Sequence, residues 1–253
     1  MAHKPRKRFG QNFLVDHQVI NQIISTIAPK RDDNIIEIGP GKGALTFPLV
    51  EYLEHLSVIE IDRDLISILE AQNNQKISIY NSDALVFDFN QFSKKLRIVG
   101  NLPYNISSPL LFHLLNYKDN IIDMTFMLQK EVVERIVASP GSKSYGRLSV
   151  VMQAFFDAEL MFIVPKDSFD PQPKIESAIL YLKTKSIPLV QNLKPLENIV
   201  KLAFSQRRKT LKNCLKSKLN QSQTKIDLSQ RAEMLTLENF VTLMNDYEKQ
   251  NRN

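Results

Sequence analysis

Short apolar runs alternate with longer amphipathic stretches through most of the chain. The short runs are rich in Ile and Val and predict buried strands, which lie at 35–38, 56–61, 77–80, 96–100 and 121–128. The stretches between them have the length of helices, and they lie at 43–54, 63–73, 107–116 and 129–138. Because two parallel strands need a crossover that covers the sheet, this alternation predicts a doubly wound α/β fold.

The segments that flank this alternation have patterns of their own. Residues 16–28 place five aliphatic side chains on one face of a predicted helix, with Asp16 as its N-cap and Pro29 after its end. Residues 145–157 predict another helix, and 158–164 and 175–184 predict two strands joined by a Pro-rich turn. Such a pair can form an antiparallel hairpin at a sheet edge, which brings the expected sheet to seven strands.

The composition changes after Lys185. Pro188 and Pro195 interrupt the chain, and from about residue 196 the apolar spacing is helical with no further strand signal. We therefore expect two domains. Residues 1–187 contain the sheet, and residues 188–253 form a small helical domain.

Positive charge is concentrated in two segments. The chain has 33 Lys and Arg against 27 Asp and Glu, yet residues 1–15 and 198–226 contain cations and no acid. Concentrated cations attract phosphates, so this distribution predicts a polyanionic partner. The alternative is a pair of solvated basic faces without a partner.

Cysteine usage and hydropathy exclude several classes of protein. Cys214 is the single cysteine, which excludes internal disulfides and cysteine-rich zinc sites. No apolar run approaches the roughly 18 residues that a membrane helix needs. The cationic N-terminus is followed by polar residues rather than by the apolar stretch of a secretory signal. We therefore expect a cytoplasmic protein.

Three of the seven glycines stand together in Gly39-Pro40-Gly41-Lys42-Gly43, directly after a predicted strand. This indicates a loop that approaches a ligand closely, with a tight turn as the alternative. Glu60 ends the next strand, where a carboxylate can bind ribose hydroxyls. Asp83 follows the third strand, where it is either a turn residue or an acceptor for an adenine amine. Together they predict a nucleoside pocket, which S-adenosylmethionine or a nicotinamide dinucleotide would satisfy.

The segment Asn101-Leu102-Pro103-Tyr104 follows the fourth predicted strand and distinguishes these ligands. The N6 amine of adenine is a poor nucleophile. Oxygen atoms that accept hydrogen bonds from its two N–H groups would activate it. The Asn101 side chain and the Leu102 or Pro103 carbonyl can serve as these acceptors, and Tyr104 offers a ring for an extruded base. This chemistry requires no metal or catalytic His, and we predict no metal site.

These motifs resemble those of the small-subunit ribosomal RNA adenine dimethyltransferase family over essentially the whole chain. The matching segments are KRFGQNFL (7–14), EIGPGKGALT (37–46), VIEID (58–62), GNLPYNISSP (100–109), MLQKEV (127–132), YGRLSV (145–150), FDPQPKIESA (169–178) and FSQRRKTL (204–211). The resemblance implies a Rossmann-like class I methyltransferase sheet in the domain at 1–187, S-adenosylmethionine as methyl donor, and RNA binding by the small helical domain at 188–253. It also implies dimethylation of two adjacent adenosines near the 3′ end of 16S-type rRNA, within a 30S-type assembly intermediate. We expect a monomer.

The resemblance implies roles for individual residues as well. The implied cofactor contacts are Asn12, Leu14, Gly39, Gly41, Glu60, Asp83, Ala84 and Asn101. Phe169 would stack on the target base opposite Tyr104, unless it is a core aromatic. The cations expected to contact RNA are Arg6, Lys7, Arg8, Arg147, Arg207, Arg208 and Lys209.

Three alternatives stay open at this point. A large-subunit rRNA adenine methyltransferase of the antibiotic-resistance type shares the glycine loop and an Asn-x-Pro-aromatic motif, although Leu102 and the segment after it fit the small-subunit family better. An RNA-binding assembly factor could keep the fold without the chemistry, and a checkpoint role in assembly could coexist with catalysis. A nicotinamide oxidoreductase is the weakest alternative, because the loop lacks the G-x-G-x-x-G spacing.

Overall fold

The computed structural model describes residues 12–93, 95–206 and 208–251. The chain forms two compact units. The first consists of the residues up to 133 together with 159–183, and the second of 134–158 together with the residues from 184 onward. The first contains most of the sheet and the second is mainly helical. The division into a methyltransferase domain at 1–187 and an RNA-binding domain at 188–253 stays a prediction.

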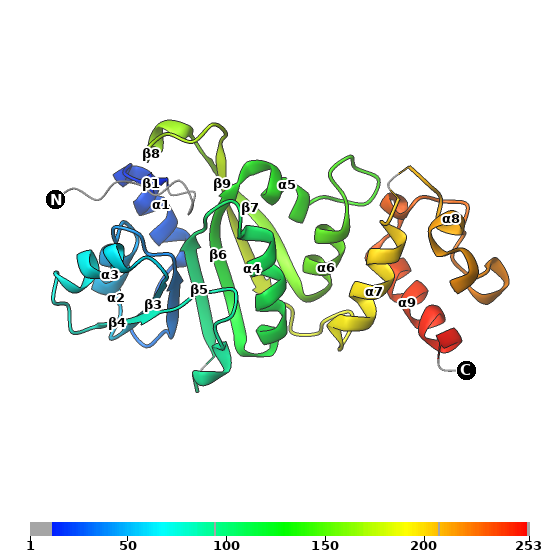
Figure 1. Cartoon of the computed structure of the whole chain (residues 1–253), viewed down its shortest axis with the longest axis horizontal. Helices are drawn as coiled ribbons and strands as arrows, with labels where there is room; N and C mark the ends of the chain where they lie inside the picture. The colour runs from blue at the N-terminus through cyan, green and yellow to red at the C-terminus, as the bar shows by residue number, and fades with distance from the viewer. Residues whose placement is uncertain (1–11, 94, 207, 252–253) are drawn as a thin grey trace. The chain divides into compact units, whose positions relative to one another are not determined.

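A seven-stranded mixed sheet is the centre of the first unit, with the strand order β4-β3-β2-β5-β6-β9-β7 (Figure 1). Its strands are β2 (Ile35–Ile38), β3 (Leu56–Glu60), β4 (Ile77–Asn81), β5 (Leu96–Asn101), β6 (Ile121–Gln129), β7 (Phe156–Val164) and β9 (Ser177–Thr184). The pairs among β2 to β6 are parallel, and β9 runs antiparallel to β6. This confirms the predicted fold class, with the last two strands as neighbours at one edge.

One helix precedes the parallel strands, three join them and one follows them, and several of their ends match the sequence signals. They are α1 (His17–Ile27), α2 (Thr46–Tyr52), α3 (Arg63–Glu70), α4 (Ser107–Leu114) and α5 (Lys130–Ile136). Asp16 caps α1 by accepting the backbone N–H of Gln18 at 2.8 Å, as predicted. Asp62 caps α3 in the same way. The predicted helix at 43–54 is shorter in the structure, from Thr46 to Tyr52, and Gly43, with a φ of +89°, lies outside it.

Short 3-10 helices complete the chain, and they are η2 (Phe89–Gln91), η3 (Leu115–Asn120), η4 (Lys166–Ser168), η5 (Lys216–Lys218), η6 (Gln221–Gln223) and η7 (Ala232–Met234). One hydrophobic cluster packs α1 and α2 against the sheet through residues such as Ile23, Leu49 and Leu56. Figure 1 shows α4 on the viewer's side of the sheet. Its Leu110, Leu111 and Leu114 are fully buried.

A two-stranded ribbon, which the sequence analysis did not predict, ties the start of the described chain to a distant loop. It pairs β1 (Phe13–Leu14) with β8 (Phe169–Asp170) in antiparallel register. The Val15 N–H donates to the Ser168 carbonyl at 2.9 Å. The Ser168 hydroxyl donates to Asp16 at 3.2 Å, so the N-cap of α1 belongs to the same connection.

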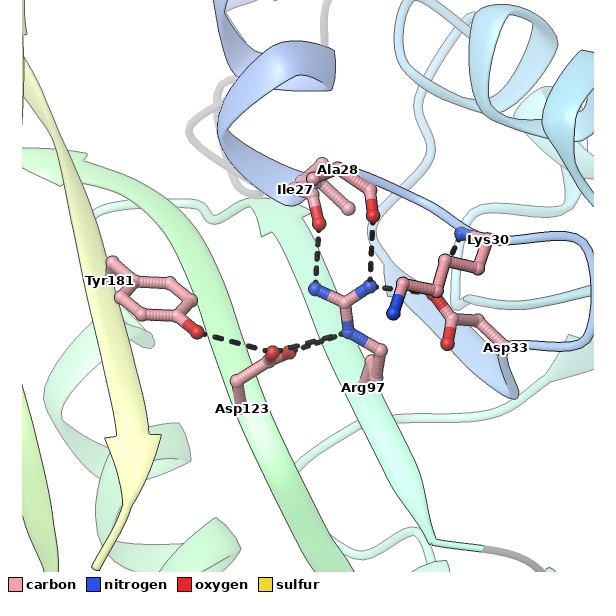
Figure 2. A network of polar contacts seen from close by, with 7 residues as sticks. All are labelled: Ile27, Ala28, Lys30, Asp33, Arg97, Asp123 and Tyr181. Atoms are coloured by element: carbon pink, nitrogen blue, oxygen red, sulfur yellow. Dashed lines mark hydrogen bonds and ion pairs between the residues drawn. The ribbon is translucent and has the colours of Figure 1, made fainter.

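The amino end of the sheet is held by a buried ionic network around Arg97 on β5 (Figure 2). Its guanidinium bonds Asp123 on β6 at 3.0 Å and Asp33 at 2.6 Å. It also donates to the carbonyl of Ile27 at 2.6 Å, at the end of α1. Tyr181 on β9 donates its hydroxyl to Asp123 at 3.3 Å. One cation therefore joins two strands, a loop and the end of a helix.

The second unit is built from helices packed on a small aromatic core. Its helices are α6 (Arg147–Phe155), α7 (Leu193–Ala203), α8 (Leu211–Leu215) and α9 (Leu237–Asn251). Phe204, directly after α7, stacks on Phe240 of α9 with ring centroids 5.7 Å apart, and Tyr145 meets the edge of Phe204. The described residues after 184 contain no strand, as the composition change predicted.

Replacing Arg97 with Met should lower the free energy of unfolding by about 3 kcal/mol, because two nearly buried carboxylates would lose their cation. Tyr181→Phe removes one neutral donor and should cost about 1 kcal/mol. Chemical denaturation measures both values.

Arg31→Met is the matched control. The Arg31 and Glu54 side chains are 83% and 62% exposed, against 11% for Arg97, so loss of the exposed pair should change stability by no more than about 0.5 kcal/mol. Equal losses for Arg97→Met and Arg31→Met would contradict a structural role for the buried network.

Candidate active site at the carboxyl edge of the sheet

A cavity of about 760 Å³ opens at the carboxyl ends of β2, β3, β4 and β5, within the first unit. Its volume lies in the range of small-molecule sites. The predicted site residues that line it are Asn12, Leu14, Gly39, Gly41, Glu60, Asp83, Ala84, Asn101, Leu102, Pro103 and Tyr104. Residues as far apart in sequence as Asn12 and Tyr104, 92 positions, therefore line the same cavity.

The cavity lies where the strand order reverses, because β2 has β3 on one side and β5 on the other. The backbones approach closely here. A Cβ on Gly100 of β5 would lie 2.4 Å from the Ile38 carbonyl oxygen of β2, and a Cβ on Gly39 would lie 3.8 Å from the Asn101 carbonyl oxygen. The glycine loop (39–43) therefore lies next to the segment 101–104, here called the Asn101 corner, and both line the cavity.

The glycine loop takes a conformation that favours glycine. Gly39 and Gly41 have φ values of +68° and +60°. A Cβ on Gly41 would come within 3.3 Å of the Phe13 ring, and the Lys42 ammonium lies 4.5 Å from the centre of that ring. The residues before α1 thus pack directly on the loop and form part of the cavity wall.

Two carboxylates line the cavity at the ends of β3 and β4. The Oε1 of Glu60 accepts the backbone N–H groups of Ile61 and Asp62, both at 2.8 Å. Burial raises the pKa of Glu60, although these donors and the backbone of Gly41 oppose the rise. Asp83 accepts the Leu85 N–H at 2.9 Å, so it is both a turn residue and a cavity residue.

Glu37 on β2 is a cavity residue that the sequence analysis missed. It is buried, and the Thr46 hydroxyl donates to its Oε2 at 2.6 Å. Burial raises the pKa of Glu37 to about 7, and the nearby Glu60 adds to the rise. Its position two residues before Gly39 was the available signal, but a single acidic residue in an Ile-rich strand does not by itself indicate a site.

The Asn101 corner has its own hydrogen bonds. The Asn101 Nδ2 donates to the Asn12 carbonyl at 3.2 Å. Since a carbonyl only accepts, the amide nitrogen faces Asn12 and the Oδ1 is left for a donor. The Pro103 carbonyl accepts from the Ile106 N–H at 3.1 Å and from the Ser107 hydroxyl at 3.2 Å, which engages both of its lone pairs. The Leu102 carbonyl is the remaining backbone acceptor among those predicted.

Phe169 does not line the cavity in this structure. It is 5% exposed and packs in the hydrophobic cluster with α1 and α2, where its strand pairs with Leu14. This position corresponds to the core aromatic that was the alternative interpretation. Its stacking on a target base stays a prediction.

The residues predicted to contact RNA lie near the N-terminus and in the second unit. Arg6, Lys7, Arg8 and Arg207 lie outside the described residues. Arg208 and Lys209 are exposed in the second unit. Arg147 begins α6, and its guanidinium lies 3.8 Å from Glu197 on α7. These assignments stay predictions.

Two further features concern the described part of the chain. No three His, Cys, Asp or Glu side chains gather there as a metal ion would require. No helix in the same residues is both long and apolar enough to cross a bilayer.

The raised pKa of Glu37 predicts a dependence of stability on pH. Glu37 is easier to protonate in the folded protein than in the unfolded chain, where its pKa has the ordinary value of 4.5. Its protonation therefore stabilises the folded protein fully below pH 4.5, and this stabilisation is lost as the pH rises through about 7. Glu37→Gln keeps an acceptor for Thr46 and cannot ionise. From pH 5 to pH 8, its free energy of unfolding should therefore gain about 2 kcal/mol relative to the wild type.

Denaturation curves at the two pH values provide the measurement, and Glu54→Gln, which changes an exposed carboxylate, is the control. A difference between Glu37→Gln and the wild type that stays constant with pH would show that Glu37 titrates normally.

The similarity to known proteins is consistent along the chain. A family model described as Ribosomal RNA adenine dimethylase matches residues 2–249. A protein of Nitrosospira multiformis named Ribosomal RNA small subunit methyltransferase A is 48% identical, with 98% of each chain covered. A protein of Saccharophagus degradans with the same name is 51% identical, with 96% of this chain and 95% of the relative covered.

Solved structures give the same result. A dimethyladenosine transferase from Plasmodium falciparum superposes with a TM-score of 0.81 and 26% identity, covering 94% of this chain and 98% of the other. The 23S rRNA methyltransferase ErmE superposes with a TM-score of 0.73 and 25% identity, covering 94% of this chain and 100% of the other. With a family match over nearly its full length, and with its glycine loop and Asn101 corner around one cavity, the chain belongs to the ribosomal RNA adenine dimethylase family.

Proposed function

We propose that the protein transfers methyl groups from S-adenosylmethionine to N6 of two adjacent adenosines in the 3′-terminal hairpin of small-subunit rRNA. The substrate would be the rRNA within a 30S-type assembly intermediate in the cytoplasm, and the protein would act as a monomer. The observation that carries the proposal is the Asn101 corner. Its amide nitrogen is held by the Asn12 carbonyl, so its oxygen is oriented as an acceptor in the cavity.

The residues present fit a nucleoside cofactor with a cationic sulfur. Glu60, fixed by backbone donors, is the ribose partner, and Asp83 with the Ala84 backbone suits the adenine. Gly39 and Gly41 allow the loop to approach the ligand, and Asn12 and Leu14 would close over its methionine end. When bound, S-adenosylmethionine would supply an electrophilic methyl group, and the bond from that methyl to the cationic sulfur would break as the methyl is transferred.

The residues of the corner activate the amine. Asn101 Oδ1 and the Leu102 carbonyl accept hydrogen bonds from the two N6–H groups. These bonds concentrate electron density on the nitrogen as it becomes tetrahedral. The Pro103 carbonyl is engaged by Ile106 and Ser107 and therefore holds the shape of the corner. Tyr104, at the cavity, offers a face for the extruded base. Positioning supplies most of the acceleration, and the proton leaves to solvent after attack.

Two considerations favour the small-subunit substrate over its alternatives. Relatives that cover nearly the whole chain at about half identity bear the name Ribosomal RNA small subunit methyltransferase A. An assembly factor without chemistry would have no need of an oriented Asn101 amide, although an assembly role can accompany catalysis.

Asn101→Ala should lower the turnover of rRNA methylation by about 100-fold or more, because the oriented acceptor is lost. The assay incubates undermethylated small subunits with radiolabelled S-adenosylmethionine and identifies N6,N6-dimethyladenosine by nucleoside analysis.

Asn116→Ala, an exposed change after α4, is the matched control and should retain activity. Near-normal turnover of a folded Asn101→Ala variant would refute the assigned role. In a parallel incubation with large subunits, label found in their rRNA would instead favour the antibiotic-resistance type of enzyme.

Replacing the basic cluster Arg207, Arg208 and Lys209 with Ala should reduce the salt dependence of RNA affinity. Each lost phosphate contact removes about 0.9 from the slope of log K against log salt for a duplex, so the slope should flatten by up to about 3.

A control of equal charge is needed. It replaces three exposed cations of the first unit, namely Lys30, Arg31 and Lys76. If both triple variants flatten the slope equally, the effect is one of net charge, and the basic cluster is not a specific RNA contact.

A further inference from the structure

The Tyr104 side chain is anchored at its far end. Its hydroxyl lies 2.8 Å from the Ser177 Oγ, a hydrogen-bond distance, and burial raises the pKa of Tyr104. Tyr104 lines the cavity, whereas Ser177 is fully buried. The contact joins the loop after β5 to the first residue of β9, which is 73 positions away in sequence.

Ser177 is itself fixed from two sides. It pairs with Gln129 in the antiparallel register of β6 and β9. The preceding residue, Glu176, accepts the Lys130 N–H at 3.1 Å with its carbonyl and the Lys130 ammonium at 2.9 Å with its carboxylate. The hydroxyl that meets Tyr104 therefore belongs to a rigid part of the sheet.

A tyrosine held at its backbone and at its hydroxyl loses most of its freedom to swing. The backbone end is fixed as well, because the preceding residue is Pro103, whose carbonyl accepts two hydrogen bonds. Such a ring presents one orientation toward the cavity before any base arrives. Pre-organisation of this kind lowers the entropy lost on binding and keeps a reacting group in line.

We propose that Ser177 is a positioning residue, whose hydroxyl holds the Tyr104 ring as a fixed stacking surface for the target adenine. This assignment rests on the proposed function, in which the extruded base stacks on Tyr104. Ser177 would not touch the base or the methyl donor. Its effect would pass through a single hydrogen bond, and Ser177→Ala and Tyr104→Phe remove that same bond from opposite ends.

The test compares Ser177→Ala, Tyr104→Phe and the double variant. Each single variant should lower kcat by roughly threefold to tenfold, as expected for one net hydrogen bond, with the KM for S-adenosylmethionine unchanged. The double variant should be no worse than either single variant, since one bond cannot be lost twice.

The spectroscopic readout uses small-subunit rRNA with 2-aminopurine at the target adenosine. In the complex with the wild type, stacking on the ring should quench the fluorescence of the extruded base. Both single variants should show weaker quenching.

Tyr181→Phe is the matched control, because it removes a hydroxyl hydrogen bond from the same strand at the Arg97 network, away from the cavity. It should lower the midpoint of thermal unfolding without changing kcat or quenching. If Ser177→Ala behaves like Tyr181→Phe, its hydroxyl only stabilises the fold and the proposal is wrong.

Tyr104→Ala separates this proposal from the function on which it rests. If Tyr104→Ala loses activity while Ser177→Ala and Tyr104→Phe keep full kcat, stacking stands and the role of Ser177 is refuted. If Tyr104→Ala is fully active, Tyr104 is not a stacking surface, and both assignments are overturned. A wild-type protein without methyl transfer to small-subunit rRNA would overturn the proposed function and this assignment with it.

Discussion

The close approach of β2 and β5 at their carboxyl ends is the constraint on which the site depends. A side chain at position 100 would collide with the Ile38 carbonyl, because the backbones of β2 and β5 lie almost in contact there. This is also the point where the strand order reverses. This places the glycine loop after β2 beside the Asn101 corner after β5. A ligand at the loop and a base at the corner can then share one cavity.

The two ends of the sheet have different tasks. At the amino end, the Arg97 network ties α1 to three strands and a loop. At the carboxyl end, polar groups such as the Asn101 amide and the Glu60 carboxylate face a cavity.

The features that could be predicted from the sequence are those set by local patterns and by the geometry of parallel strands. The strand runs, the caps Asp16 and Asp62, and the gathering of Gly39, Glu60, Asp83 and Asn101 at one edge follow from periodicity and from the geometry of parallel strands. The ribbon of β1 and β8 and the burial of Phe169 depend on contacts between distant segments, and the cavity position of Glu37 depends on how the strands around it are arranged. Periodicity carries no information on these, since each side chain also suits an ordinary core or surface position.

The engaged Pro103 carbonyl has a consequence for repeated transfer to one nitrogen. The corner then offers two acceptors, Asn101 Oδ1 and the Leu102 carbonyl, which match the two protons of an unmodified adenine amine. A monomethylated amine has a single proton and an added methyl group, so one acceptor faces carbon instead of a donor. With the amine bound at the corner as proposed, the first and second methylations are therefore chemically unequal steps in the same pocket.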